Sequence, residues 1–301
     1  MGGGSWTAQA YSNHYSVRGM SVTDGVIKTA VSNQEMFVAR DLDNALNPRH
    51  VIRECCDSEE HPNTIPIILA LDVTGSMGQT AVEIAKKLNV IITDLYSKIQ
   101  DVEFMIMGIG DFSYDSCPLQ VSQFESDIRI AEQLDKLFFE FGGGGNSYES
   151  YSAAWYFATH HTKLDCWNRG KKGIIITMGD EQLNPYIPLV GRRTNFVSVT
   201  GDRLQDNIET KDLYEDTIKK YDIYHINVLH RHTYPDKYEE QSIRGSFAPY
   251  LDDEHFKSVK MSDISSTITD IIINAASSGA ETIVNSSNTD VMTNENGEII
   301  W

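Results

Sequence analysis

Residues 65–76 read IPIILALDVTGS. The first seven form a continuous apolar run, which is typical of a strand that is buried on both faces of a parallel sheet. Pro66 is compatible with this strand because it lies near its start. From Met77 to Leu95, apolar residues recur at spacings of three and four, which predicts a helix. The stretch therefore predicts a buried strand followed directly by a helix, which is the repeating unit of an α/β fold.

The alternation of strands and helices continues to about residue 276. Further strands are predicted at 102–109, 119–124, 173–178 and 223–229, and further helices at 126–141, 148–161, 207–221 and 262–276. This alternation predicts a doubly wound, mostly parallel central sheet flanked by helices. We expect three parts: an N-terminal extension (1–60) packed on the main domain, the α/β domain itself (61–276) and a polar C-terminal tail (277–301).

The composition narrows the classes of function. The 301 residues include 43 Asp or Glu and 25 Lys or Arg, which gives a formal net charge of −18. This charge disfavours binding to nucleic acid or to an anionic membrane. The four cysteines, Cys55, Cys56, Cys117 and Cys166, have neither the spacing of a zinc site nor that of a disulfide framework. Since no signal peptide and no membrane-spanning apolar stretch is evident, we expect a cytoplasmic protein.

Oxygen-bearing side chains follow several of the predicted strands. Asp72, Thr74 and Ser76 come after the first strand, Asp111 after the second, and Asp180 after a later one. Ligands of open parallel sheets bind at the carboxyl ends of the strands, where these residues would meet. Carboxylate and hydroxyl oxygens suit Mg²⁺ better than zinc or copper. The sequence therefore predicts a metal site at this edge of the sheet, although Thr74 and Ser76 could also simply cap the helix.

The pattern resembles a known family. Asp72-x-Thr74-x-Ser76, followed by a glycine-rich loop before a helix and by Asp180, resembles the metal-ion-dependent adhesion site of von Willebrand factor A (vWA) domains. The resemblance covers roughly residues 64–276. It implies that Thr74 and Ser76 bind the cation directly, whereas Asp72 and Asp180 act largely through coordinated water.

The middle of the chain resembles most a prokaryotic-type, intracellular subgroup of this family. In that subgroup the second strand ends in Gly-Asp and the loop reads Gly-Gly-Gly-Asp-x-x-Glu; this chain has Gly110-Asp111 and GGGNSYE at 143–149. Many family members place a threonine in the loop, and here Asn146 or Ser147 could supply that oxygen. The resemblance implies further supporting carboxylates behind the ligands, for which the candidates are Asp111, Glu149 and Glu181.

The resemblance also implies a function. The cation, Mg²⁺ with Mn²⁺ or Ca²⁺ as alternatives, would keep an open position that an Asp or Glu of a partner protein completes. We therefore expect a cation-dependent protein-binding module and not an enzyme, with an AAA+ ATPase system as one partner suggested by bacterial relatives. Tyr148, Tyr151 and Trp155, at helical spacing, are expected to be core residues.

Two other functions stay open. The first is a Mg²⁺-dependent phosphoester hydrolase in which Asp72 attacks phosphorus, although such enzymes need a second Asp where this chain has Thr74. The second is a structural assembly subunit whose metal site is vestigial. A phosphate-binding loop is disfavoured, because no lysine follows the glycines at 142–145.

Overall fold

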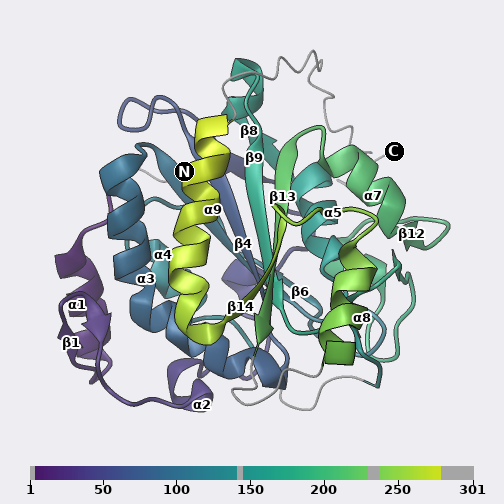
Figure 1. Cartoon of the computed structure of the whole chain (residues 1–301), viewed down its shortest axis with the longest axis horizontal. Coiled ribbons are helices and arrows are strands. Elements are labelled where there is room, and N and C mark those ends of the chain that lie inside the picture. Colours follow the sequence, from purple (N-terminus) through teal and green to yellow (C-terminus); the bar gives the residue numbers. More distant parts are fainter. Residues whose placement is uncertain (1–3, 141–144, 230–236, 279–301) are drawn as a thin grey trace.

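The computed structural model describes residues 4–140, 145–229 and 237–278. At the centre of these residues is a six-stranded sheet with the strand order β14-β13-β9-β4-β5-β6 (Figure 1). All neighbouring pairs in this sheet are parallel except β5 and β6, which are antiparallel. The strands are β4 (Ile65–Asp72), β5 (Val102–Ile109), β6 (Leu119–Val121), β9 (Gly173–Gly179), β13 (Tyr221–Leu229) and β14 (Phe256–Lys260). The predicted doubly wound, mostly parallel sheet is confirmed.

Helices cover both faces of this sheet (Figure 1). One face packs against α3 (Gly78–Lys98), α4 (Arg129–Leu134) and α9 (Ile264–Ser278), and the other against α5 (Ser152–His160), α7 (Thr210–Thr217) and α8 (Lys237–Phe247). Successive residues of β4 enter the two layers in turn, Ile67 and Leu69 on the α3 side and Ile68 and Ala70 on the α5 side. This explains why the strand reads as a continuous apolar run.

Residues 4–36, in the segment before β4, lie along the outside of α3 and α4 (Figure 1), whereas Arg53–Cys55 pairs with Thr162–Leu164 and belongs to the layer on the α5 side. The indole N–H of Trp6 donates to Asn89 Oδ1 at 2.9 Å, and the Tyr11 hydroxyl donates to the Ala85 carbonyl at 2.8 Å. The segment contains α1 (Ala8–Val17), β1 (Val22–Thr23), β2 (Val26–Ile27), α2 (Asn33–Met36) and β3 (Arg53–Cys55). Trp6 and Tyr11 are thus buried against α3, the helix that follows β4.

Three predicted helices are longer than those in the structure. The helix predicted at 126–141 is α4, which ends at Leu134, and the one predicted at 207–221 is α7. The helix predicted at 148–161 begins only at Ser152, because residues 148–149 form β7 and pair with β10 (Gln182–Leu183). The spacing of apolar residues within a segment carries no information about a strand that pairs with it from more than thirty residues away along the chain.

The remaining elements are short and connect the main ones. They are β8 (Thr162–Leu164), β11 (Tyr186–Ile187), α6 (Phe196–Thr200) and β12 (Ile208–Glu209), with 3-10 turns at Asn44–Leu46, Gly75–Met77, Asp165–Arg169 and Met261–Asp263. None of the helices in the described ranges is long and apolar enough to cross a lipid bilayer. The tail after residue 278 and the glycines at 142–144 lie outside the described residues.

Candidate metal centre

The site lies at the carboxyl end of β4, at the end of the sheet nearer α2 in Figure 1. β4 ends at Asp72, and the 3-10 turn Gly75–Met77 leads into α3. Because of this turn, the hydroxyl oxygens of Thr74 and Ser76 are 3.5 Å apart. Asp180 follows β9, the neighbour of β4, and its Oδ1 lies 3.0 Å from the Ser76 hydroxyl oxygen. The structure thus brings together the four residues at the centre of the predicted site.

The two carboxylates accept the protons of the two hydroxyls. Thr74 donates to Asp72 Oδ1 from its hydroxyl at 2.6 Å and from its backbone N–H at 2.8 Å. The Ser76 hydroxyl donates to Asp180 Oδ1. A hydroxyl has one proton and two lone pairs, so donation to a carboxylate leaves the lone pairs for a cation. Asp72 and Asp180 therefore orient the hydroxyls and supply negative charge, whereas Thr74 and Ser76 are the groups suited to direct binding.

Tyr151 connects the ends of β4 and β9. Its side chain is fully buried, and its hydroxyl donates to Asp72 Oδ2 at 3.0 Å while it accepts the backbone N–H of Glu181 at 3.4 Å. Gly179 makes room for it, because a Cβ there would lie 1.8 Å from the Tyr151 hydroxyl oxygen. Tyr151 thus holds Asp72 in place, which its position among apolar residues did not indicate.

The core prediction for the three aromatic residues near this site holds in part. Tyr151 and Trp155 are fully buried, as expected. The prediction is wrong for Tyr148, which is exposed because it lies in β7 at the rim and not in a helix.

Burial and mutual repulsion raise the pKa values of the carboxyls around Asp72. Burial and the carboxylate of Asp180 raise the pKa of Asp72 to about 7. Burial and then Asp72 raise the pKa of Glu149 well above its usual range, and burial and then Asp180 raise the pKa of Glu181 to about 7. Within the described part of the chain, the buried Oε2 of Glu149 has no hydrogen-bond partner. A cation bound at Thr74 and Ser76 would favour the charged forms of these carboxyl groups and so lower their pKa values.

Asp111 braces the loops beside the site. It follows β5 directly after Gly110 and is fully buried. Its Oδ1 accepts the backbone N–H of Ser113 at 2.9 Å and the side-chain amide of Asn184 at 3.1 Å, and its Oδ2 accepts the side-chain amide of Asn146 at 2.9 Å. Since these donors occupy the carboxylate, Asp111 positions three loops. Asn184 is a further residue that the sequence pattern did not reveal.

The two loop residues proposed as oxygen donors have different surroundings. Both polar groups of the Asn146 side chain already form hydrogen bonds. Its amide N–H donates to Asp111, and its Oδ1 accepts the backbone N–H of Tyr148 at 3.3 Å. Ser147 is exposed, and its backbone carbonyl accepts the N–H of Gln182 at 3.2 Å. Which of the two would supply an oxygen to a cation stays a prediction.

The donor set suits a hard divalent cation. Neighbouring oxygens around Mg²⁺ with bonds of about 2.1 Å lie about 3 Å apart, and around the larger Ca²⁺ roughly 3.5 Å apart. The oxygens of the two expected direct ligands, Thr74 and Ser76, are 3.5 Å apart, which is within about 0.5 Å of either spacing. In the described ranges, no group of three or more His, Cys, Asp or Glu side chains could hold a metal ion. Hydroxyls such as those of Thr74 and Ser76 are not among the usual ligands of zinc.

No protein-family model matches the chain, and no curated protein does. Solved structures that are similar in fold include two pilus proteins and one protein of the mussel byssus. The pilus adhesin SpaC from Lactobacillus rhamnosus GG has a TM-score of 0.46 and 11% identity over 72% of this chain and 30% of the SpaC chain. The vWF domain of the type V pili tip protein Mfa5 from Porphyromonas gingivalis has a TM-score of 0.46 and 10% identity over 75% of this chain and 98% of the Mfa5 chain.

The third is proximal thread matrix protein 1 from the mussel byssus, with a TM-score of 0.40 and 12% identity over 76% of this chain and 47% of that one. This chain therefore spans less than a third of the SpaC structure and about half of the mussel protein.

Proposed function

We propose that the chain is a divalent-cation-dependent protein-binding module whose site consists of Asp72, Thr74, Ser76 and Asp180. One observation carries this proposal: two hydroxyls on one turn donate their protons to two carboxylates, so that their lone pairs remain for a cation. Mg²⁺ is the expected ion, and Mn²⁺ or Ca²⁺ would use the same oxygens. The bound cation would attract an Asp or Glu of a partner protein, because few of its own ligands are charged.

The burial of Asp72 favours binding over phosphoester hydrolysis. A nucleophilic carboxylate needs an oxygen that reaches the substrate, whereas Asp72 is fully buried and accepts three hydrogen bonds, two from Thr74 and one from Tyr151. The position two residues later, where such hydrolases carry their acid, is Thr74. A hydrolase is therefore the weaker candidate. The AAA+ system as partner, the cytoplasm as location and a bacterial, intracellular subgroup stay predictions.

Calorimetric titration of the full chain with MgCl₂ tests the metal site. We expect one binding event per chain that Ser76→Ala weakens at least ~tenfold, because this variant removes a direct ligand. Ser97→Ala is the matched control, since Ser97 lies in the last turn of α3, the helix that follows Ser76, and its hydroxyl donates to the backbone carbonyl of Asp94 at 2.7 Å. Absence of binding, or equal affinity of the two variants, would contradict the proposed site.

Partner capture tests the function itself. Proteins retained from a source lysate with Mg²⁺ and released by EDTA are expected to be lost with Asp72→Asn. If Asp72→Asn retains the same partners, the site is vestigial and the chain is an assembly subunit. If the purified chain hydrolyses p-nitrophenyl phosphate with Mg²⁺ and Asp72→Asn abolishes this activity, the chain is an enzyme.

A further inference from the structure

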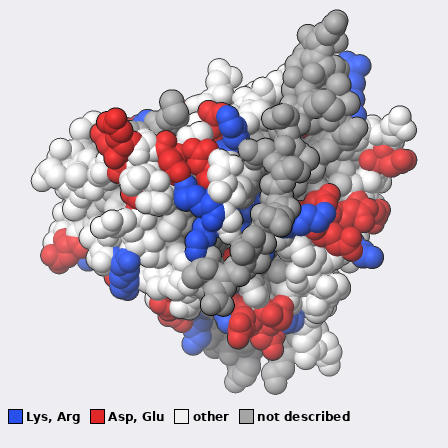
Figure 2. Space-filling view, turned by 90° about the horizontal axis from the view of Figure 1, so that it is seen from above, with Lys and Arg blue, Asp and Glu red and all other residues white. Residues whose placement is uncertain are grey.

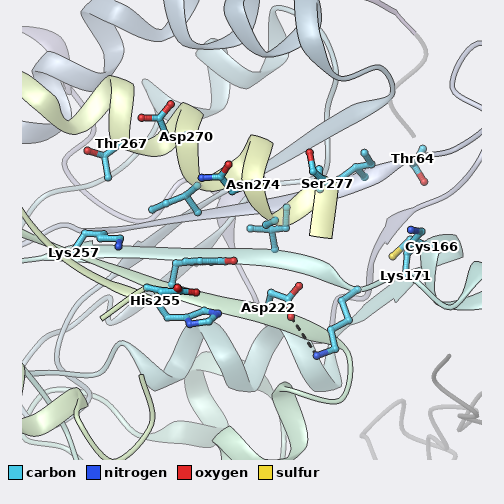
Figure 3. Close-up of a pocket in the computed structure, with 18 of the residues that line it drawn as sticks. Thr64, Cys166, Lys171, Asp222, His255, Lys257, Thr267, Asp270, Asn274 and Ser277 are labelled. Atoms are coloured by element: carbon cyan, nitrogen blue, oxygen red, sulfur yellow. Dashed lines mark hydrogen bonds and ion pairs between the residues drawn. The ribbon is translucent and has the colours of Figure 1, made fainter. Parts of the chain in front are cut away.

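A groove lies on the α9 face of the sheet and extends from the amino ends of β4, β9 and β13 along α9 to Thr267, and none of the four residues of the proposed metal site lines it. It encloses about 1330 Å³ between α9 and the sheet, from the start of β13 at Asp222 and Tyr224 to Lys257 and Val259 of β14. Figure 3 shows α9 along one side of it and the sheet along the other; the labelled residues of α9 are Thr267, Asp270, Asn274 and Ser277, and those on the sheet side include Asp222, His255 and Lys257.

The floor of the groove is apolar and incompletely covered. Ile174, Ile271 and Ala275 line it and are buried, whereas Tyr224 and Val259 line it and are only half-buried. Apolar side chains that line an open groove gain free energy when another apolar group covers them. The groove is therefore suited to an apolar segment of polypeptide.

The rim of the groove is more basic than the rest of the chain. The residues that line it include the basic Arg169, Lys171, Lys172 and Lys257 and the acidic Asp222, Glu254 and Asp270. The whole chain has 25 basic and 43 acidic residues, so this lining reverses the general balance. Figure 2, which looks onto this end of the molecule, shows lysine and arginine side chains near its middle with acidic side chains beside them. Lys172 pairs with Asp222 at 3.2 Å and Arg169 pairs with Asp57, so an acidic segment that binds here would share these cations with the carboxylates beside them.

The chain itself supplies such a segment. Residues 279–301 contain Glu281, Asp290, Glu295 and Glu298 and no basic residue, and they end in Ile299-Ile300-Trp301. They begin directly after α9, and Ser277 of α9 lines one end of the groove. These 23 residues can extend over roughly 75 Å, whereas α9 spans only ~15 Å from Thr267 to Ser277. The segment is long enough to turn back and follow the whole groove.

We propose that Ile299, Ile300 and Trp301 bind in this groove of the same chain and cover Tyr224 and Val259. Covalent attachment holds the segment at an effective concentration of roughly millimolar, which favours the chain's own segment over that of a second copy. Glu295 and Glu298 then lie close enough in sequence to reach the basic rim. This inference does not depend on the proposed metal site, which lies at the other end of the strands.

Photo-crosslinking tests the inference on the full chain. Trp301→p-benzoylphenylalanine keeps an aromatic group at the position and crosslinks to neighbouring C–H groups on irradiation. In dilute solution we expect a product of monomer mass in which residue 301 is joined to a peptide that contains Tyr224, Val259 or Ile271. A dimer-mass product, crosslinks confined to other surfaces, or no crosslink would each overturn the proposal.

Two further changes make the test specific. Tyr224→Glu, which places a charge on the groove floor, is expected to lower the crosslink yield at least ~tenfold, whereas Tyr186→Glu, the same change at a partly exposed tyrosine outside the groove, leaves the yield unchanged. Ile299→Ser with Ile300→Ser removes the apolar contacts from the segment without altering the core. An undiminished yield in that double variant would overturn the proposal even if Tyr224→Glu does not fold.

Discussion

Asp72 is subject to opposing effects that set the properties of the candidate site. Burial and the nearby Asp180 disfavour its charged form, whereas the hydrogen bonds from Thr74 and Tyr151 favour it. A divalent cation would add a stronger attraction in the same direction as those hydrogen bonds. The groups that donate to Asp72 should therefore control both how well the site is ordered and how tightly it binds a cation.

Tyr151→Phe removes the donor to Asp72 Oδ2. We expect it to lower the free energy of unfolding by about 1–3 kcal/mol, because a buried acceptor loses its partner, and to weaken Mg²⁺ binding ~10- to 100-fold. Tyr221→Phe is the matched control, since Tyr221 is equally buried and its hydroxyl lies 2.6 Å from the Thr162 hydroxyl, away from the site. Calorimetry should show weaker Mg²⁺ binding in the first variant alone; unchanged affinity in both would refute the role of Tyr151.

Gly179→Ala tests the room that Tyr151 requires. Its Cβ would lie 1.8 Å from the Tyr151 hydroxyl oxygen, so we expect a loss of about 1–3 kcal/mol in the free energy of unfolding. Gly245→Ala is the control, because a Cβ at this position of α8 meets nothing within 4 Å. That variant should stabilise the chain by up to about 1 kcal/mol through higher helix propensity. Urea unfolding that shows equal effects for both would contradict the packing described here.

The sequence revealed those site residues that follow a strand directly. Asp72 and Asp180 could be placed because strands of a parallel sheet end at one edge. Tyr151 and Asn184 could not, because their partners Asp72 and Asp111 lie 79 and 73 positions away. Hydrogen bonds over such separations depend on how loops fold together, and no local spacing encodes them.

At the scale of elements, the buried strands were more predictable than the helices. β4 and β5 carry apolar side chains to both faces, so a continuous apolar run marks each of them. α4 is shorter than its apolar spacing predicts, and Asp135 directly after it accepts the Tyr15 hydroxyl at 3.1 Å. When a residue from another part of the chain determines where a helix ends, the local spacing of apolar residues does not indicate that end.

His225 of β13 gives the structure a specific pH dependence. It is fully buried against Phe247, with ring centroids 4.0 Å apart, and burial lowers its pKa to about 3. Because the ordinary value is 6.5, the unfolded chain binds a proton here between about pH 3 and 6.5 that the folded chain does not. The contribution of His225 to stability is therefore complete above pH 6.5 and is lost as the pH falls below it.

His225→Asn should reveal this contribution. Below about pH 6, stability of the native chain is expected to fall more steeply than that of the variant, by about 1.4 kcal/mol per pH unit. Urea unfolding at pH 8, 6, 5 and 4 measures the difference. A difference between native and variant that stays constant over this range would show that His225 titrates alike in both states.

At the scale of the whole molecule, the candidate metal centre and the groove beside α9 are two separate regions around one sheet. The candidate metal centre lies at the carboxyl ends of the strands, and the groove under α9 extends to their amino ends. Residues 4–36 cover α3 and α4 and contact Asp135, which accepts hydrogen bonds from Tyr15 and Arg18 and lies 2.7 Å from His14 Nε2. The composition of this segment indicated an extension too small to fold alone, but not which helices it covers.

Asp135→Ala should loosen this N-terminal segment. Three side chains lose a shared carboxylate that is only 10% exposed, so we expect a loss of about 2 kcal/mol in the free energy of unfolding. Asp216→Ala is the control, because the Asp216–Lys219 pair is 54% and 66% exposed and should contribute less than ~0.5 kcal/mol. Equal unfolding midpoints in urea for the two variants would mean that Asp135 does not anchor the segment.

The most direct test of the metal site is X-ray diffraction from crystals grown with MnCl₂, recorded at the manganese absorption edge. The proposal predicts an anomalous peak within bonding distance of both Thr74 Oγ1 and Ser76 Oγ, beside Asp180, and its loss in crystals of Ser76→Ala. A well-ordered turn at Gly75–Met77 with no peak, or with manganese bound elsewhere on the acidic surface, would contradict it.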